Sequence, residues 1–349
     1  MIGGMLRPFA AVARLAGTAA LTVLGLLLVT FLIGRVLPID PVLAAVGDRA
    51  TAEVYERTRA ELGLDRPLPE QFVVYVGKVL RGDFGRSVLT SNPVLSDIGR
   101  FFPATLELAT LATLIGVAVG VPLGVAAAAR QGRWPDQVAR VVGLLGYSIP
   151  VFWLGLVALL LFYARLGWAG GPGRLDVAYE DLVEPRTGLI LIDAALDGDW
   201  EVLRNALSHI VLPASVLAYF SLAYISRMTR SFMLEQLRQE YVVTARAKGL
   251  SERVVVWRHA FGNIRVPLIT VIVLSYASLL EGSVLTETVF AWPGLGLYVT
   301  NSLLNADMNA VLGGTVIVGI AFIALNLVSD LLYRIADPRA AAAAAKGRA

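Results

Sequence analysis

Long apolar runs separated by polar connectors dominate the pattern of this 349-residue chain. A helix needs roughly 20 apolar residues to cross about 30 Å of hydrocarbon; four uncharged runs reach that length and two are shorter. The six runs cover residues 15–34, 108–129, 141–164, 210–226, 266–280 and 310–329. We therefore predict an all-α integral membrane protein with six transmembrane helices.

The connector between the first two runs carries two shorter helical patterns. Residues 51–62 and 69–80 are each followed by a glycine, Gly63 or Gly82, which is a helix stop signal. This pattern predicts an outer segment over residues 38–100 that folds around two surface helices. The alternative is a loop in which these two helices are frayed.

Proline and alanine mark the remaining boundaries. Pro103 suits the first turn of a helix, so the second span is predicted to begin there, and the segment 146–150 should break the third run near its entrance. The first span and its tail occupy residues 1–37 and a five-span core occupies residues 101–339. The alanine-rich tail at 340–349 is predicted to be disordered.

Charge alternates between successive connectors. Residues 227–265 hold eight arginines and lysines against three glutamates, whereas residues 174–201 hold two arginines against eight acidic residues. Arginine and lysine concentrate on the cytoplasmic side of membrane proteins. The pattern therefore places both termini and residues 227–265 in the cytoplasm. The acidic connector either attracts a cationic solute or docking protein, or merely lacks the basic residues of the inner side.

The composition is typical of a membrane protein, and the positive net charge has a simple explanation. Hydrophobic residues make up 56% of the chain and charged residues only 16%, against about 25% in ordinary globular proteins. The net charge of +3 is accounted for by the basic connectors, so it does not call for a nucleic-acid partner. Membrane lipid is the surrounding medium that this composition requires.

One polar stretch, residues 240–267, has the pattern of two short helices joined by a hinge at 249–251. Gly249 can adopt the left-handed conformation that ends a helix, and the Ser251 hydroxyl can cap the next one. The first helix carries small residues and two cations: Thr244, Ala245 and Ala247 with Arg246 and Lys248. A small, charged helix can lie close to another protein surface. The alternative is an ordinary basic loop that joins two spans.

No catalytic or nucleotide-binding pattern accompanies this hinge. The two histidines, His209 and His259, lack the spacing of a zinc enzyme, and the chain has no cysteine. No Gly-x-x-x-x-Gly-Lys-Ser/Thr phosphate-binding loop occurs either. We therefore predict that the chain is not an enzyme, has no metal site or cofactor of its own, and depends on another chain if a nucleotide drives it.

Three ionisable residues near the ends of the apolar runs are possible parts of a transport path. Glu107 begins the second run, Asp330 follows the sixth, and Glu281 lies sixteen residues beyond Arg265, about 24 Å along a helix. All three fall near a membrane boundary, so the chain lacks the midplane charges typical of ion-coupled carriers. Glu281 and Glu107 remain candidates for a translocation path.

Several short motifs, in order, resemble the permease subunits of bacterial ABC importers for peptides, in the dipeptide, oligopeptide and nickel branch. The motifs are Glu61-Leu-Gly-Leu-Asp-Arg-Pro67, Gly82-Asp-Phe-Gly-Arg-Ser87, Pro103-Ala-Thr-Leu106, Thr244-Ala-Arg-Ala-Lys-Gly-Leu-Ser251 and Phe290-Ala-Trp-Pro-Gly-Leu-Gly296. The resemblance extends over nearly the whole chain and implies the six-span permease fold of binding-protein-dependent importers.

The resemblance also implies a mechanism and a set of partners. Within the cytoplasmic loop 230–267 it assigns an ATPase-coupling helix made of Thr244, Ala245, Arg246, Ala247, Lys248, Gly249, Leu250 and Ser251. Closure of two ATPase subunits, which bind ATP and Mg, would move this helix and open the path outward. A homologous second permease would complete the pore in the bacterial plasma (inner) membrane, and an extracytoplasmic solute-binding protein would deliver the peptide.

The sequence departs from this pattern at three places, and two other functions stay open. Val243 stands where the coupling loop usually carries a charge, Gly262 where this branch often has arginine, and Met308-Asn309 where a Tyr-Pro pair is usual. A self-contained secondary carrier or channel is the main alternative, and a membrane scaffold without transport function is the other. The resemblance leaves the cargo open among dipeptides, longer peptides, peptide-like solutes and nickel complexes.

Overall fold

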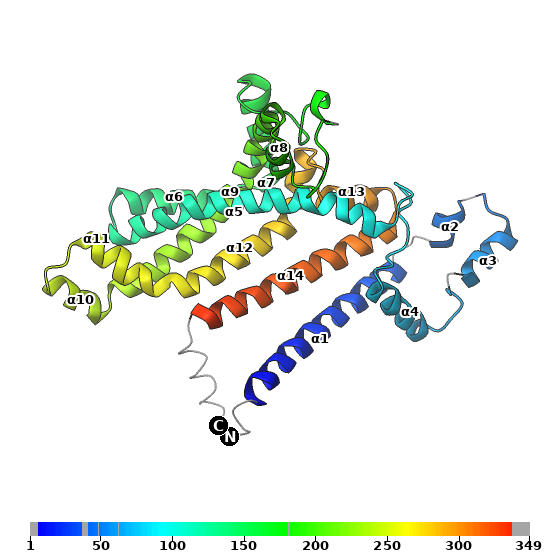
Figure 1. Cartoon of the computed structure of the whole chain (residues 1–349), viewed down its shortest axis with the longest axis horizontal. Coiled ribbons are helices and arrows are strands. Elements are labelled where there is room, and N and C mark those ends of the chain that lie inside the picture. Colours follow the sequence, from blue (N-terminus) through cyan, green and yellow to red (C-terminus); the bar gives the residue numbers. More distant parts are fainter. Residues whose placement is uncertain (1–5, 37–40, 48, 62, 181, 337–349) are drawn as a thin grey trace. The chain divides into compact units, whose positions relative to one another are not determined.

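The computed structural model describes residues 6–36, 41–47, 49–61, 63–180 and 182–336. The predicted disordered tail at 340–349 lies outside these residues. The described chain is built from helices, with one isolated bridge between Arg86 and Pro93 as its β contact (Figure 1). The helices longer than one turn are α1 (Leu6–Val36), α2 (Pro41–Val46), α3 (Ala52–Glu61), α4 (Leu68–Leu80), α5 (Val94–Ala129), α6 (Trp134–Ser148), α7 (Val151–Ala158), α8 (Ile190–Asp197), α9 (Trp200–Leu237), α10 (Glu240–Ala247), α12 (Phe261–Val289), α13 (Leu295–Leu304) and α14 (Met308–Ala336).

Short segments complete the chain between these helices. The π-helical segment η2 (Leu159–Arg165) extends α7, and a second π-helical segment, η4 (Val255–Ala260), joins α11 (Glu252–Val254) to α12. A 3₁₀ turn, η3 (Val177–Tyr179), lies in the connector before α8. Both predicted surface helices are present as α3 and α4.

Six membrane spans fit the described helices. Five helices are long and apolar enough to cross a membrane: α1, α5, α9, α14 and the helix Glu252–Val289 that contains α12. The segments Trp134–Ser148 and Val151–Arg165 are bent by 102° at the break between them. Counted together as one broken span, they form the sixth. Each apolar run of the sequence lies in one of these spans, so the predicted all-α fold with six spans is confirmed.

Prolines act differently at the two predicted positions. The third span breaks between Ser148 and Val151, where Ile149 is extended because the residue before a proline is pushed out of the helical region. This predicted break is confirmed. The predicted start of the second span at Pro103 is wrong, because α5 already begins at Val94 and Pro103 lies inside it. A proline inside a helix leaves one carbonyl unpaired, which a neighbouring residue can satisfy.

The described chain divides by its internal contacts into two compact units. The N-terminal unit comprises residues 1–102 and 298–323, and the core unit comprises residues 103–297 and 324–349, of which only the described positions are discussed. This division concerns packing alone. The predicted boundaries of the outer segment and of the permease core stay predictions.

In the core unit, α5 packs closely against α9 along a stripe of glycines. A Cβ atom on Gly116 would lie 2.5 Å from the Ser221 hydroxyl, and one on Gly124 would lie 2.5 Å from the Ser226 carbonyl oxygen. Gly120, one turn away from each, meets the backbone of α9 at 3.1 Å. Small residues at this spacing let two membrane helices approach until their backbones touch.

A buried ion pair fixes the start of α6 to α9. The Asp136 side chain is 1% exposed and receives hydrogen bonds from Arg230 at 2.6 and 3.1 Å, from Arg140 at 3.1 Å and from the Gly132 amide at 2.9 Å. A buried carboxylate is tolerated when such donors replace its water. The tight turn between α5 and α6 is thus held against α9.

In the N-terminal unit, the 82–93 loop is held by a carboxylate, that of Asp307, and by the side-chain amide of Asn309. Asp307 accepts hydrogen bonds from the Ser87 hydroxyl at 2.5 Å and the Leu89 amide at 3.2 Å, while its other oxygen accepts one from the Ala310 amide at 3.3 Å. Asn309 donates to the carbonyl of Arg86 at 2.9 Å. Asp307 and Asn309 therefore fix the start of α14 to this loop; Asn309 is one of the two residues that stand where the resemblance led us to expect a Tyr-Pro pair.

Replacing Gly124 by alanine should weaken the packing of α5 on α9. The added methyl group would collide with backbone atoms of α9, and overpacking of this kind costs roughly 1–3 kcal/mol of unfolding free energy. The melting temperature of the detergent-solubilised chain should fall. Gly99→Ala on the same helix is the matched control, because no atom lies within 4 Å of the added group. Equal melting of the two variants would contradict the close approach.

Candidate functional site

The turn after α10 closes through Gly249. This residue has φ of +78°, in the left-handed region that glycine adopts at little cost. The Gly249 amide donates to the carbonyl of Arg246 at 2.9 Å, and the Leu250 amide donates to that of Ala245 at 3.3 Å. The predicted glycine hinge is confirmed.

Ser251 stands at the predicted helix start but does not cap it with its side chain. Its hydroxyl makes no capping hydrogen bond to α11. Its backbone carbonyl instead accepts hydrogen bonds from the amides of Val254 and Val255, at 2.9 and 3.0 Å. The position of the helix boundary is thus confirmed, and the predicted hydroxyl cap is wrong.

An ion pair joins the two sides of the hinge. The Arg246 Nε and Nη2 atoms donate to the two carboxylate oxygens of Glu252 at 2.7 and 3.2 Å. These hydrogen bonds raise the pKa of Arg246 above its usual value. An exposed pair of this kind stabilises by at most about 1 kcal/mol, but its two parallel bonds fix the angle at which α11 leaves α10.

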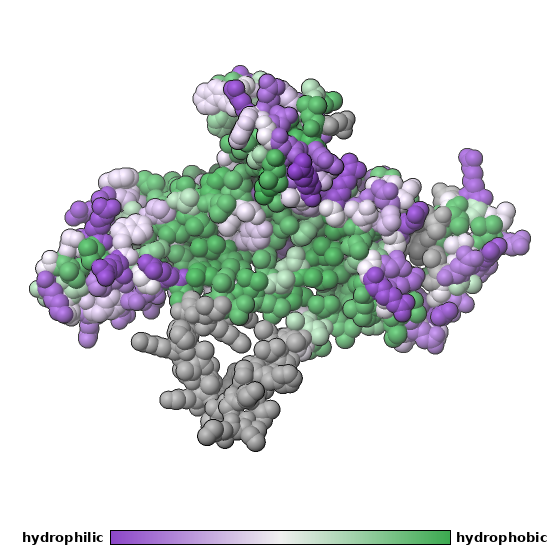
Figure 2. Space-filling model, viewed as in Figure 1, coloured by the Kyte–Doolittle hydropathy of each residue, from purple (hydrophilic) through white to green (hydrophobic). Residues whose placement is uncertain are grey.

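The hinge presents most of its predicted coupling residues outward. Val242, Ala245 and Val255 form a small buried cluster that attaches α10 to the rest of the core unit. The exposed residues are Thr244, Arg246, Ala247, Lys248, Gly249, Leu250 and Ser251. Figure 2 shows hydrophilic residues gathered around α10 and α11.

Ala245 differs from the other predicted coupling residues. Its side chain is only 6% exposed and packs against Val242 and Val255, so its small size serves contact within the chain. Ala247 is exposed. Sequence spacing alone could not separate the two alanines, because the face of α10 that turns inward depends on where η4 lies.

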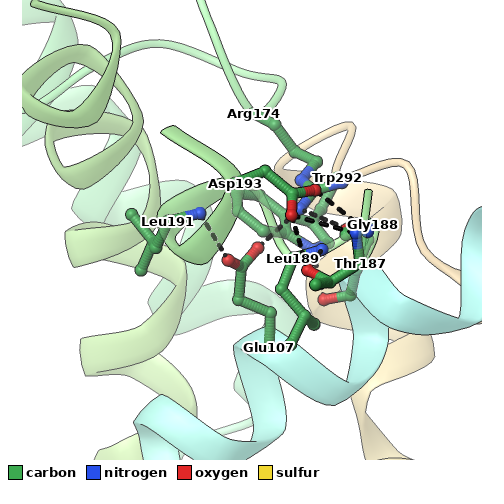
Figure 3. A network of polar contacts seen from close by, with 9 residues as sticks. Glu107, Arg174, Thr187, Gly188, Leu189, Leu191, Asp193 and Trp292 are labelled. Atoms are coloured by element: carbon green, nitrogen blue, oxygen red, sulfur yellow. Dashed lines mark hydrogen bonds and ion pairs between the residues drawn. The ribbon is translucent and has the colours of Figure 1, made fainter. Parts of the chain in front are cut away.

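Glu107 is an anchor for the connector that follows η2 (Figure 3). Its carboxylate accepts hydrogen bonds from Arg174 Nη2 at 2.6 Å and from the Leu191 amide at 2.8 Å. Arg174 also donates to the Gly188 carbonyl at 3.1 Å and lies over the Trp292 ring, 5.6 Å from its centroid. Both oxygens of Glu107 are therefore occupied by the protein itself.

Asp193 extends the same network. Its Oδ1 atom accepts hydrogen bonds from the amide and hydroxyl of Thr187 at 3.0 and 2.7 Å, and its Oδ2 atom accepts one from the Gly188 amide at 3.0 Å. Asp193 is 1% exposed. Through Glu107, the connector is thereby folded onto the middle of α5. Glu281, by contrast, is exposed on α12 and takes no part in this network.

A fully buried carboxylate belongs to Glu287, a residue that the sequence pattern did not single out. It is fully buried on α12 and accepts hydrogen bonds from Thr105 Oγ1 at 2.7 Å, Ser283 Oγ at 2.9 Å and the Leu297 amide at 2.9 Å. These donors belong to α5, α12 and α13. Glu287 therefore ties together three segments of the core unit.

The 290–296 motif folds around this carboxylate. The Trp292 indole donates to the Ala104 carbonyl at 2.9 Å, and the Leu295 amide donates to Thr105 Oγ1 at 2.8 Å. A Cβ atom on Gly294 would lie 2.5 Å from the Glu287 carboxyl group, and one on Gly296 would lie 2.8 Å from it. Both glycines are required because the backbone must pass against the carboxylate.

The histidines have separate surroundings. His209 is buried on α9, with its Nε2 atom 3.4 Å from Asp176 Oδ1, and Nδ1 lies 3.0 Å from the Asn205 carbonyl oxygen. His259 lies in η4. Over the described ranges, no group of three or more histidine and acidic side chains could hold a metal ion.

Comparison with known proteins identifies the family. The profile described as "Binding-protein-dependent transport system inner membrane component" matches residues 120–342, and the profile of the N-terminal part of such membrane components matches residues 5–109. The chain belongs to this family. It is thus a multi-pass inner membrane permease of a binding-protein-dependent transport system.

Similar curated proteins carry more specific names. The permease is 46% identical over 322 residues to the probable D,D-dipeptide transport system permease protein DdpB of Escherichia coli K12, covering 91% of this chain and 94% of that protein. It is 42% identical over 329 residues to the di/tripeptide transport system permease protein DppB of Pseudomonas aeruginosa UCBPP-PA14, covering 94% and 97%.

Among solved structures, the permease has a remote structural similarity to an ABC transporter chain. An inward-facing form of the MetNI methionine ABC transporter matches with a TM-score of 0.48 and 17% sequence identity, over 67% of the permease and 93% of that chain. This likeness is too low to carry an argument about function. The family membership depends on the sequence matches.

A sequence signal for Glu287 does exist in the permease. Glu287 lies three residues before the 290–296 motif, which carries two glycines, and such a motif indicates close backbone approach to something. The apolar pattern did not predict that Glu287 is buried, because this residue lies beyond the apolar run 266–280, where an acidic residue is typical of a solvent-exposed loop. The structure shows that α12 continues to Val289 and buries it.

Replacing Thr105 by valine should destabilise the permease. The variant keeps the side-chain shape but removes the donor to Glu287 and the acceptor for the Leu295 amide. Leaving buried polar groups unpaired costs about 1–3 kcal/mol each, so the melting temperature of the purified permease should fall by several degrees. Thr288→Val is the control, because its exposed hydroxyl bonds only to the Val284 carbonyl of its own helix. Unchanged melting of Thr105→Val would contradict the role given to this network.

Proposed function

We propose that this permease forms one half of the path of an ATP-driven importer of peptides or peptide-like solutes. The assignment of peptides as the cargo is supported by one observation. The permease is 46% and 42% identical, over more than nine-tenths of the chain, to permeases named for dipeptides and tripeptides. ATP and Mg bind to partner ATPase subunits, because the sequence carries no phosphate-binding loop.

Coupling to the ATPase is assigned to the hinge between α10 and α11. Thr244, Arg246, Ala247, Lys248, Gly249, Leu250 and Ser251 form its exposed surface, and Ala245 supports it from inside. The hinge is attached to α9 through Leu237 and to η4 through Val255. A force applied to the hinge would be transmitted through these contacts to α9, which precedes the hinge, and to α12, which follows η4.

The proposed assembly has four kinds of component. A second, homologous permease completes the pore, two ATPase subunits bind in the cytoplasm, and an extracytoplasmic solute-binding protein delivers the cargo. The charge of the connectors supports this orientation, with the α10 hinge and both termini in the cytoplasm. The acidic connector at 174–201 then faces the side from which cargo arrives.

Reconstitution into liposomes tests this function. The complete assembly should take up a labelled dipeptide only when ATP, the ATPase subunits and the binding protein are all present. The permease alone should take up none. Uptake by the permease alone, driven by an ion gradient, would favour a self-contained carrier and overturn the proposal.

Replacing Ala247 by tryptophan should block coupling. A large ring on the exposed side of α10 prevents the close approach of another surface, so ATP-dependent uptake should fall at least ten-fold while the melting temperature of the permease is kept. Arg133→Trp, at the exposed start of α6, is the matched control and should keep uptake. Ala245→Trp should instead lower the melting temperature, because that side chain is buried. Normal uptake by Ala247→Trp would remove the hinge from the coupling role.

Glu281 remains a proposed contact of the translocation path. Its carboxylate is exposed on α12, whereas that of Glu107 is held by Arg174 and Leu191. Glu281→Gln should therefore change the uptake rate of the reconstituted assembly more than Glu107→Gln does at equal melting temperature. Unchanged uptake with Glu281→Gln would exclude this residue from the path.

A further inference from the structure

The N-terminal unit contains a cavity whose lining includes none of the residues proposed for coupling or for the translocation path. Its volume is about 350 Å³, and it is lined by the end of α1, by α4, by the start of α14 and by residues from the 61–66 and 83–85 segments. This volume is within the range of about 300–1,000 Å³ typical of small-molecule sites. All of its walls belong to one compact unit.

One part of the cavity wall is apolar. Phe31 of α1 is 5% exposed, and its ring lies 5.4 Å from that of Phe72 and 5.7 Å from that of Tyr75, both on α4. Val74 and Leu312 also line the cavity. This wall suits hydrocarbon rather than a small hydrated ion.

The rest of the lining carries three cations: Arg35, Arg66 and Lys78. Among the described residues, none of the three forms an ion pair with a carboxylate. Arg35 lies over the Phe31 ring, 5.3 Å from its centroid. These cations are thus available to an anion from outside the chain.

The two acidic residues in the lining are already engaged. Glu61 is paired with Arg57 at 2.9 Å, and Asp83 accepts a hydrogen bond from the Gly85 amide at 3.0 Å. The charge presented to a ligand is therefore positive.

A buried amide oxygen adds a polar group to the same wall. Gln71 is 9% exposed, and its Nε2 atom donates to the carbonyls of Leu64 and Arg66 at 3.3 and 2.7 Å. Its Oε1 atom has no hydrogen-bond partner within the described structure. An unpaired buried acceptor costs free energy, and a hydroxyl or amine of a ligand headgroup would satisfy it.

The position of the cavity along α1 identifies the source of the anion. The candidate span Gly17–Arg35 ends at Arg35, so the cavity lies where hydrocarbon gives way to lipid headgroups. A phospholipid offers the matching sequence of groups at this depth: an acyl chain for the apolar wall, a phosphate for the cations and a polar headgroup beyond them. Lysine and arginine side chains close to a membrane surface attract acidic lipids electrostatically.

We propose that this cavity binds an acidic phospholipid, with its phosphate at Arg35 and Lys78 and its first acyl carbons against Phe31 and Val74. The bound lipid joins α1 to α4 and stabilises the N-terminal unit, because a ligand that binds only the folded state raises its stability. This site is independent of the peptide cargo and of the ATPase.

The test compares lipids on the intact permease by native mass spectrometry and by thermal unfolding. Phosphatidylglycerol should stay bound to the wild-type chain and raise its melting temperature, while phosphatidylcholine and glycerol phosphate should do neither. Equal effects of phosphatidylcholine would overturn the charge-selective site. Equal effects of glycerol phosphate would show a free-phosphate site and overturn the lipid assignment.

Variants locate the site. Arg35→Gln and Lys78→Gln should each lower phosphatidylglycerol affinity about five-fold, which corresponds to about 1 kcal/mol for each cation near a lipid surface. Val74→Trp should abolish binding with all charges kept, because it fills the apolar part. Arg81→Gln is the matched control, since Arg81 is exposed at the end of α4 and does not line the cavity. Wild-type affinity in both charge variants would overturn the proposal.

Discussion

The buried carboxylate of Glu287 constrains the core unit, because three of its segments must meet around it. No cation lies among its hydrogen-bond partners in the described chain, so the Thr105 and Ser283 hydroxyls and the amides of Gly296 and Leu297 must offset the cost of burying it. These donors come from three segments, and each must hold its place for the carboxylate to stay satisfied. The two glycines at 294 and 296 follow from the same constraint, because any side chain there would displace the carboxylate.

Other acidic residues of the described chain repeat this arrangement. Asp136 joins α6 to α9, Glu107 holds the connector after η2, and Asp307 holds the 82–93 loop at the start of α14. In each case a carboxylate accepts a hydrogen bond from a backbone amide of a turn, a loop or the first turn of a helix, which would otherwise be left without a partner near the membrane. The connectors are therefore rigidly attached, whereas the α10 hinge keeps its polar groups on the surface, where a partner can reach them.

The spans were predictable because apolar length alone determines which segments can cross hydrocarbon. Gly249 and the break before Val151 were also predictable, since glycine and proline restrict the backbone locally. The face of α10 that buries Ala245 was not, because it depends on η4, a segment that is close in space only after folding. The burial of Glu287 was not predictable for a similar reason. Thr105 is 182 residues away in the sequence, and Leu297 lies beyond the loop between α12 and α13, so hydrophobic periodicity carries no information about either contact.

The ion pair across the hinge bears on the proposed docking to an ATPase. Arg246 is already bound on two atoms by Glu252, so it shapes the turn, and its charge is largely neutralised for a partner. Val243, at the place where a charge is usual, is 62% exposed, and Leu250 is 40% exposed. Lys248 is then the main free cation of the described hinge, beside two exposed apolar residues. Docking of this surface would depend more on apolar contact than on charge, and such contact is less sensitive to salt than ion pairing is.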